Sequence, residues 1–226
     1  MASGKEEAKA MGTYYSMVEG KFRTKVDEDT PNAVRREWST PDGKSGVKHE
    51  LVYNALFGRI ETIKVVDGDY GKQILITLEE SEDGETPIIA LSADSKYGVD
   101  FMKKAPNIKL DREVRFMPFD FEDDKGKRII GLRLEHKGDE GKYTEKINNY
   151  YSDGEKALHG FPVPPDNARE IWDKKDWKNY FDYTIVKFLL AELSERVLPK
   201  FGSKVSPGNS AEYYPEEEIK PEDIPF

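Results

Sequence analysis

Short stretches of β-branched and aromatic residues alternate with turn residues roughly every ten positions between Tyr14 and Tyr151, which is typical of a mainly β protein. The pattern predicts strands over residues 13–26, 33–39, 47–66, 72–79, 87–92, 113–121, 127–136 and 142–151. The stretches between them contain Gly or Asp, which tolerate the positive φ angles of tight turns. These predicted turns are residues 40–43, 67–71, 82–84 and 124–126.

One helix is expected among the strands. Tyr97, Phe101 and Met102 follow a helical spacing, Asp94 is placed to cap the first turn, and Ala105-Pro106 ends it. Over residues 50–137 the predicted order is three strands, one helix and two strands. That is the order of the OB-fold, a five-stranded Greek-key barrel with one inserted helix, although a β-sandwich fits the strand spacing as well.

A second helix is predicted over residues 176–199. Its apolar residues recur at helical spacing, Asp176 is the expected cap, and Pro199 ends it. The apolar face must be covered, either by the barrel or by a second copy in a homodimer; packing on the barrel is the favoured alternative.

Composition suggests how the 226 residues are divided. The expected parts are a disordered N-terminal segment (1–9), an OB-fold domain with added strands (10–151), a Pro-rich linker (152–168), the amphipathic helix (169–201) and a disordered acidic tail (202–226). The absence of cysteine excludes disulfides, thiol nucleophiles and cysteine-bound zinc. No apolar run is long enough to span a bilayer and the first residues do not resemble a signal peptide, so a cytoplasmic location is expected.

The chain shows no pattern typical of catalysis. His49, His136 and His159 share no metal-ligand spacing and neighbour no nucleophile motif. Neither an enzyme activity nor a metal or cofactor is therefore expected.

Basic and aromatic residues alternate on several of the predicted strands. Single-stranded nucleic acid requires this combination, because cations contact phosphates and flat rings stack on unpaired bases. On residues 113–121 the alternation places Val114 and Phe116 on one face and Arg115 and Phe119 on the other. The candidate DNA-binding residues are Arg35, Arg36, Trp38, Tyr53, Arg59, Tyr70, Lys72, Arg115, Phe119, Arg133, Tyr143, Lys146 and Tyr150.

The net charge is distributed unevenly. From residue 207 on, six acidic residues accompany the single base Lys220, so this stretch carries −5 of the formal net charge of −9. The remainder is still at −4, whereas nucleic-acid-binding modules are usually basic. Binding would then depend on a local basic stripe and should weaken as salt rises.

The chain ends in an acidic stretch followed by Ile224-Pro225-Phe226. A terminal Phe offers a ring to an apolar pocket and a carboxylate to a neighbouring cation. The candidate partner-binding residues are Glu222, Asp223, Ile224, Pro225 and Phe226.

This ending resembles the C-terminal tip of bacterial and phage single-stranded-DNA-binding proteins (SSBs). Residues 69–74 and 97–101 also resemble phage-encoded OB-fold proteins of that type. The chain lacks the long Gln/Gly/Pro-rich linker of cellular bacterial SSBs and adds the helix at 176–199, which puts their tetrameric assembly in doubt.

The resemblance implies a non-catalytic protein that coats single-stranded DNA during replication, recombination or repair. Its tip would recruit replication and recombination enzymes. Two alternatives remain at this point: an OB-fold adaptor whose groove binds a protein, and a strand-annealing recombination protein.

Overall fold

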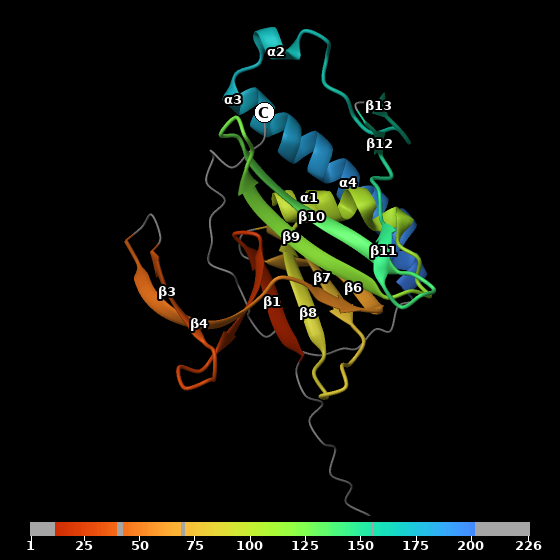
Figure 1. Cartoon of the computed structure of the whole chain (residues 1–226). Helices are drawn as coiled ribbons and strands as arrows, with labels where there is room; N and C mark the ends of the chain where they lie inside the picture. Colours follow the sequence, from red (N-terminus) through yellow and green to blue (C-terminus); the bar gives the residue numbers. More distant parts are fainter. Residues whose placement is uncertain (1–11, 40–42, 69–70, 155, 202–226) are drawn as a thin grey trace, which may run out of the picture.

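The computed structural model describes residues 12–39, 43–68, 71–154 and 156–201, and it shows a mainly β protein with a C-terminal helix (Figure 1). Strands predominate, as the alternation of apolar and polar residues predicts. Residues 1–9, Tyr70 and the acidic tail lie outside the described residues.

Seven strands form the larger sheet, in the order β3-β4-β2-β1-β8-β7-β6. Neighbouring strands run antiparallel except for β1 and β8, which pair in parallel. The strands are β1 (Thr13–Val18), β2 (Lys21–Val26), β3 (Val34–Ser39), β4 (Ser45–Tyr53), β6 (Ile60–Gly68), β7 (Gly71–Leu78) and β8 (Pro87–Ser92).

A second, four-stranded sheet has the order β11-β10-β9-β5. Its neighbouring strands are all antiparallel. The strands are β5 (Leu56–Gly58), β9 (Val114–Glu122), β10 (Arg128–Lys137) and β11 (Tyr143–Lys146); a separate two-stranded ribbon consists of β12 (Ser152–Asp153) and β13 (Lys156–Ala157).

The single strand predicted over 13–26 is wrong, because the chain turns back at Glu19 and Gly20. Both residues have positive φ, 50° and 70°, and Val18 pairs with Lys21 across the turn. A Cβ on Gly20 would lie 2.7 Å from the backbone nitrogen of Asp120, so this turn also packs closely on β9.

The long strand predicted over 47–66 is broken into three. β4 and β6 belong to the larger sheet, whereas the short β5 between them pairs with β9 in the second sheet. The chain therefore changes sheets twice in this region. The last predicted strand, 142–151, is also too long, because β11 ends at Lys146.

The helix α1 (Lys96–Lys104) lies between β8 and β9 in the chain, and η1 (Ala105–Asn107) continues it. Its N-cap is Ser95, whose hydroxyl accepts a hydrogen bond from the Gly98 N–H at 2.9 Å. The predicted cap, Asp94, is therefore wrong by one residue; its carboxylate instead accepts a hydrogen bond from the Ser92 hydroxyl.

Two side chains of α1 satisfy the backbone of β10. The Leu132 N–H donates to the Asp100 carboxylate at 2.7 Å, and Lys104 donates to the Leu132 carbonyl at 2.6 Å. Lys104 and Asp100 also form an ion pair at 2.6 Å. β11 pairs with β10 only over residues 135–137, so at Leu132 the side chains of α1 take the place of a neighbouring strand.

The C-terminal helix runs through segments of α, π and 3₁₀ geometry. After the short α2 (Ala168–Ile171), these segments are α3 (Lys174–Tyr180), η2 (Phe181–Val186), α4 (Lys187–Glu192), η3 (Leu193–Val197) and η4 (Leu198–Phe201).

The C-terminal helix begins earlier than predicted and is part of the core. Its cap is Asp173, whose carboxylate accepts from the Asp176 N–H at 2.9 Å, while the Asp176 carboxylate accepts from the Asp173 N–H. Ile185, Leu189 and Val197 are buried together with residues of both sheets and of α1. Packing of this helix on its own chain is confirmed.

No helix within the described ranges is both long and apolar enough to cross a membrane.

Candidate functional site

The outer face of the four-stranded sheet is the most distinctive surface of the molecule. On β9, Val114 and Phe116 are fully buried, which turns Arg115, Phe119 and Phe121 to the opposite face. On β10, Leu132 and Leu134 are fully buried, which turns Arg133 outward. The predicted alternation on these two strands is confirmed. We call this outward surface of β5, β9, β10 and β11 the sheet face.

Four aromatic rings lie on the sheet face in two pairs. Phe57 and Tyr143 have ring centroids 5.7 Å apart, and Phe119 and Phe121 have centroids 5.8 Å apart. Phe57 is 63% exposed and Phe121 is 53% exposed, so both rings present a large area to solvent. Exposed rings of this size on a sheet surface are available to stack on a ligand.

A glycine makes room for one of these rings. Gly131 pairs with Phe119 across β9 and β10, and a Cβ there would lie 2.5 Å from the Phe119 ring. The Phe119 ring therefore occupies the space in which a side chain at position 131 would lie. This position accepts no larger side chain unless the ring moves.

Two arginines on the sheet face share one carboxylate. Glu135, whose side chain is 4% exposed, contacts Arg115 through one oxygen and Arg133 through the other, the latter at 2.8 Å. The Arg133 side chain remains 57% exposed. Glu135 therefore fixes the two guanidinium groups and neutralises one of them, while the pair retains a net positive charge.

Tyr143 lies among further charged groups. Its hydroxyl donates to Glu113 at 2.6 Å, and the guanidinium carbon of Arg115 lies 5.3 Å from its ring centroid. Burial, followed by the hydrogen bond to Glu113, raises the pKa of the Tyr143 hydroxyl. Hydrogen bonds from Lys137 and Tyr143 hold the pKa of Glu113 below its usual value, so this carboxylate is ionised at neutral pH.

The sheet face is locally positive on an acidic protein. Among the described residues, the cations Arg115, Arg133 and Lys137 form ion pairs with two carboxylates, Glu113 and Glu135. Lys146 pairs with Glu135 in the β10–β11 register, and its ammonium has no ion-pair partner within the described part of the chain. An anionic ligand is therefore attracted to this surface.

The structure brings five of the predicted DNA-binding residues together on the sheet face. Arg59 lies next to it, where the chain passes from β5 to β6, with its guanidinium 3.6 Å from Glu79. The five are Arg115, Phe119, Arg133, Tyr143 and Lys146.

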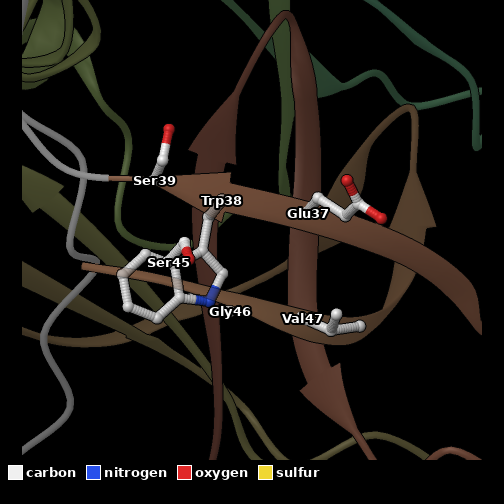
Figure 2. Close-up of a pocket in the computed structure, with 6 residues that line it drawn as sticks. All are labelled: Glu37, Trp38, Ser39, Ser45, Gly46 and Val47. Carbon is white, nitrogen blue, oxygen red and sulfur yellow. The ribbon is translucent and has the colours of Figure 1, made fainter. Parts of the chain in front are cut away.

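Three predicted residues lie elsewhere, on the hairpin of β3 and β4, which we call the arm. Figure 1 shows the arm projecting to one side, away from β9, β10 and β11. Arg35 is paired with Glu37 at 2.7 Å, and Arg36 forms two hydrogen bonds of 2.9 Å with the buried Glu50. Figure 2 shows the Trp38 ring lying across the neighbouring strand at Gly46, in a hollow of about 380 Å³.

The remaining predicted residues are separate from both groups. The Tyr53 ring packs edge-on against Tyr15 at 5.8 Å, and Lys72 forms an ion pair with Asp67 at 2.7 Å. Tyr150 stacks on the His159 ring with centroids 3.9 Å apart, so its face is already occupied. Tyr70 and the partner-binding residues 222–226 lie outside the described residues.

Three residues of the sheet face were missing from the prediction: Phe57, Phe121 and Lys137. Phe57 lies on the short β5, which the sequence did not separate from the long strand predicted over 47–66. Phe121 continues the alternation of Arg115 and Phe119, so the strand period alone could have identified it. Lys137 continues the alternation of Arg133 on β10 in the same way, but the predicted strand ended one residue earlier, at residue 136.

Among the described residues no group of three potential metal ligands comes together. Comparisons with protein-family models, with curated proteins and with solved structures found no match to this chain.

Proposed function

We propose that this chain is a non-catalytic single-stranded-DNA-binding protein that holds DNA on the sheet face. The observation that carries this proposal is the placement of four rings, two of them more than half exposed, beside Arg115, Arg133, Lys137 and Lys146. The protein would coat exposed single strands during replication, recombination or repair.

The geometry favours unpaired bases over duplex. Phe57 and Phe121 can stack on bases only if the bases are not already stacked and paired in a helix. Each such contact contributes about 1–3 kcal/mol with little regard to sequence, because every base has a π-face. Arg133 and Lys146 would then contact the phosphates, which makes the affinity dependent on salt.

An OB-type, partly open barrel is the fold that we propose for the central part. The order β6, β7, β8, α1, β9 and β10 supports it, since this is three strands, one helix and two strands. The passage of the chain from β5 to β6 also supports it, because these consecutive strands belong to the two different sheets.

Recruitment of partner proteins is assigned to residues 222–226. Their acidic character and the apolar Ile224, Pro225 and Phe226 fit a basic pocket with an apolar floor on a replication or recombination enzyme. This part of the proposal rests on the sequence.

The test is a fluorescence-anisotropy titration of labelled oligo-dT and of a duplex of equal length, at low and moderate salt. We expect tight binding of oligo-dT that weakens with salt, and much weaker binding of duplex. Arg133→Ala should weaken oligo-dT binding and reduce the slope of log affinity against log salt by about one.

Arg196→Ala is the matched control. Arg196 is 52% exposed and paired with one glutamate, Glu192, but it lies on the C-terminal helix. The Arg196→Ala variant should bind oligo-dT as the parent chain does. If the parent chain binds no oligo-dT at low salt, the proposal is wrong and a protein-binding adaptor becomes the better explanation of the sheet face.

A further inference from the structure

The strand β3 is an open edge of the seven-stranded sheet. β4 pairs with its inner side along all six residues without a bulge, from Val34 opposite Glu50 to Ser39 opposite Ser45. No strand within the described ranges pairs with its outer side. The backbone N–H and C=O groups of such an edge can pair with another strand.

The other edges of the two large sheets are short or interrupted. β5 has three residues and β11 has four. β6 is longer, but its register shifts between Ile60 and Thr62, and it contacts η4 of the C-terminal helix. β3 has neither Pro nor Lys, which commonly protect an edge from pairing.

The side chains of β3 form two rows. Val34, Arg36 and Trp38 occupy one face, and Arg35 and Glu37 occupy the other. Val34 is 48% exposed although it is apolar. A strand added to this edge would cover Val34.

The sequence of β3 is complementary to itself in an antiparallel pair. If a two-fold axis passes through Arg36, then Arg35 of each copy faces Glu37 of the other, and Val34 faces Trp38. Opposite charges and an aromatic ring with a β-branched residue are both favourable cross-strand pairs. The interface is thus isologous, as two-fold dimers require.

Neighbouring registers are less favourable. An axis through Glu37 places Glu37 against its own copy, and an axis through Arg35 does the same for Arg35. The register through Arg36 also opposes two like charges, but each Arg36 is held by two 2.9 Å hydrogen bonds to the buried Glu50 of its own chain, which offsets part of their repulsion.

We propose that two copies of this chain associate through β3, antiparallel and centred on Arg36, so that their larger sheets become continuous. Five facing residues per copy, 34–38, make a small interface, so association should depend on concentration. This proposal does not depend on DNA binding, and it gives Arg35, Arg36 and Trp38 a role in self-association.

The absence of cysteine allows a direct test by cross-linking. Arg35→Cys and Glu37→Cys are made separately, mixed and oxidised mildly, and the products are identified by mass spectrometry. Facing residues in an antiparallel pair have Cα atoms about 4.5–5.5 Å apart, which suits a disulfide. We expect the mixed 35–37 dimer to be the dominant product, exceeding both symmetric products.

Val47→Cys provides the cross-linking control, because Val47 is exposed on β4, one strand further from the edge. A second readout is sedimentation velocity over a range of concentrations. Val34→Lys should abolish dimer formation, whereas Val47→Lys, at a position of nearly equal exposure (46%), should dimerise like the parent chain.

Circular dichroism of each variant establishes that it is folded. A parent chain that stays monomeric at all concentrations would overturn the proposal. So would a mixed 35–37 product no more abundant than the Val47→Cys dimer, or a Val34→Lys variant that dimerises normally.

Discussion

Gly131 and Glu135 show how single positions on β10 prepare the sheet face. Gly131 lets the Phe119 ring lie against the backbone, and the nearly buried Glu135 holds Arg115 and Arg133 in place. Both residues restrict groups that would otherwise lose conformational freedom when a ligand binds. The sheet face is thus ordered in the absence of a ligand.

Sequence alternation predicts where a side chain points, but not what it contacts. It placed Arg115 and Arg133 on the outward face of the sheet correctly. It could not show that Arg36 is held by Glu50, which is fourteen residues away on β4 and also binds Arg23. Burial raises the pKa of Glu50, but hydrogen bonds from Arg36 and Arg23 outweigh this effect and lower it.

His136 connects β10 to the segment that follows η1. Its Nε2 atom accepts a hydrogen bond from the Lys109 N–H at 3.1 Å, so the neutral imidazole is required. Burial lowers its pKa in the folded state. As the pH falls through the unfolded value of about 6.5, the unfolded chain gains a proton that the folded chain does not, and stability decreases.

We therefore expect the thermal midpoint to fall between about pH 7.5 and pH 5.5, where histidine titrates. His136→Gln cannot gain this proton, so its midpoint should change less over the same interval. Thermal unfolding followed by circular dichroism in matched buffers measures the difference. If the thermal midpoints of the parent chain and of His136→Gln change equally with pH, His136 does not contribute to the pH dependence of stability.

At the scale of elements, the helices and most strands follow from local patterns, while breaks and boundaries depend on tertiary contacts. The β1–β2 turn was hidden because Glu19 adopts a positive φ that its side chain does not predict. The division of residues 47–66 into three strands depends on pairing with β9, which lies more than fifty residues further along the chain.

The C-terminal helix is part of the hydrophobic core, so shortening one of its buried side chains should lower the free energy of unfolding. Leu189 is 1% exposed, so Leu189→Ala should lower the free energy of unfolding by about 2–5 kcal/mol. Lys187→Ala, on the exposed side of α4, should change it by less than about 0.5 kcal/mol.

Urea denaturation followed by circular dichroism compares the two variants. Equal stability of Leu189→Ala and Lys187→Ala would mean that the helix does not depend on this packing. A drop confined to Leu189→Ala would show that burial of this side chain against the core stabilises the fold.

At the scale of the molecule, the net charge of −9 hides the feature that suggests function. Residues 207–226 carry −5 of this charge. On the sheet face, in contrast, four cations accompany two carboxylates. Composition alone argues against a nucleic-acid partner, and only the arrangement of strands shows the local excess of positive charge.

The arrangement of strands also separates residues that the sequence grouped together. The predicted DNA-binding set includes five residues of the sheet face and three of the arm, because basic and aromatic residues occur together on the strands of both surfaces. Long-range pairing places the arm at one end of the larger sheet and the rings at the other sheet. The two proposals accordingly concern different surfaces: DNA binding on the sheet face and self-association on the arm.

Photochemical cross-linking tests the central claim most directly. Oligo-dT carrying iododeoxyuridine at single positions is irradiated in complex with the full chain, and the attached residues are identified by mass spectrometry. Attachment to Phe57, Phe119, Phe121 or Tyr143 is the result we predict, because the proposed function requires these rings to stack on bases. Attachment confined to Trp38 or to the Trp172–Trp177 ring cluster would contradict the account.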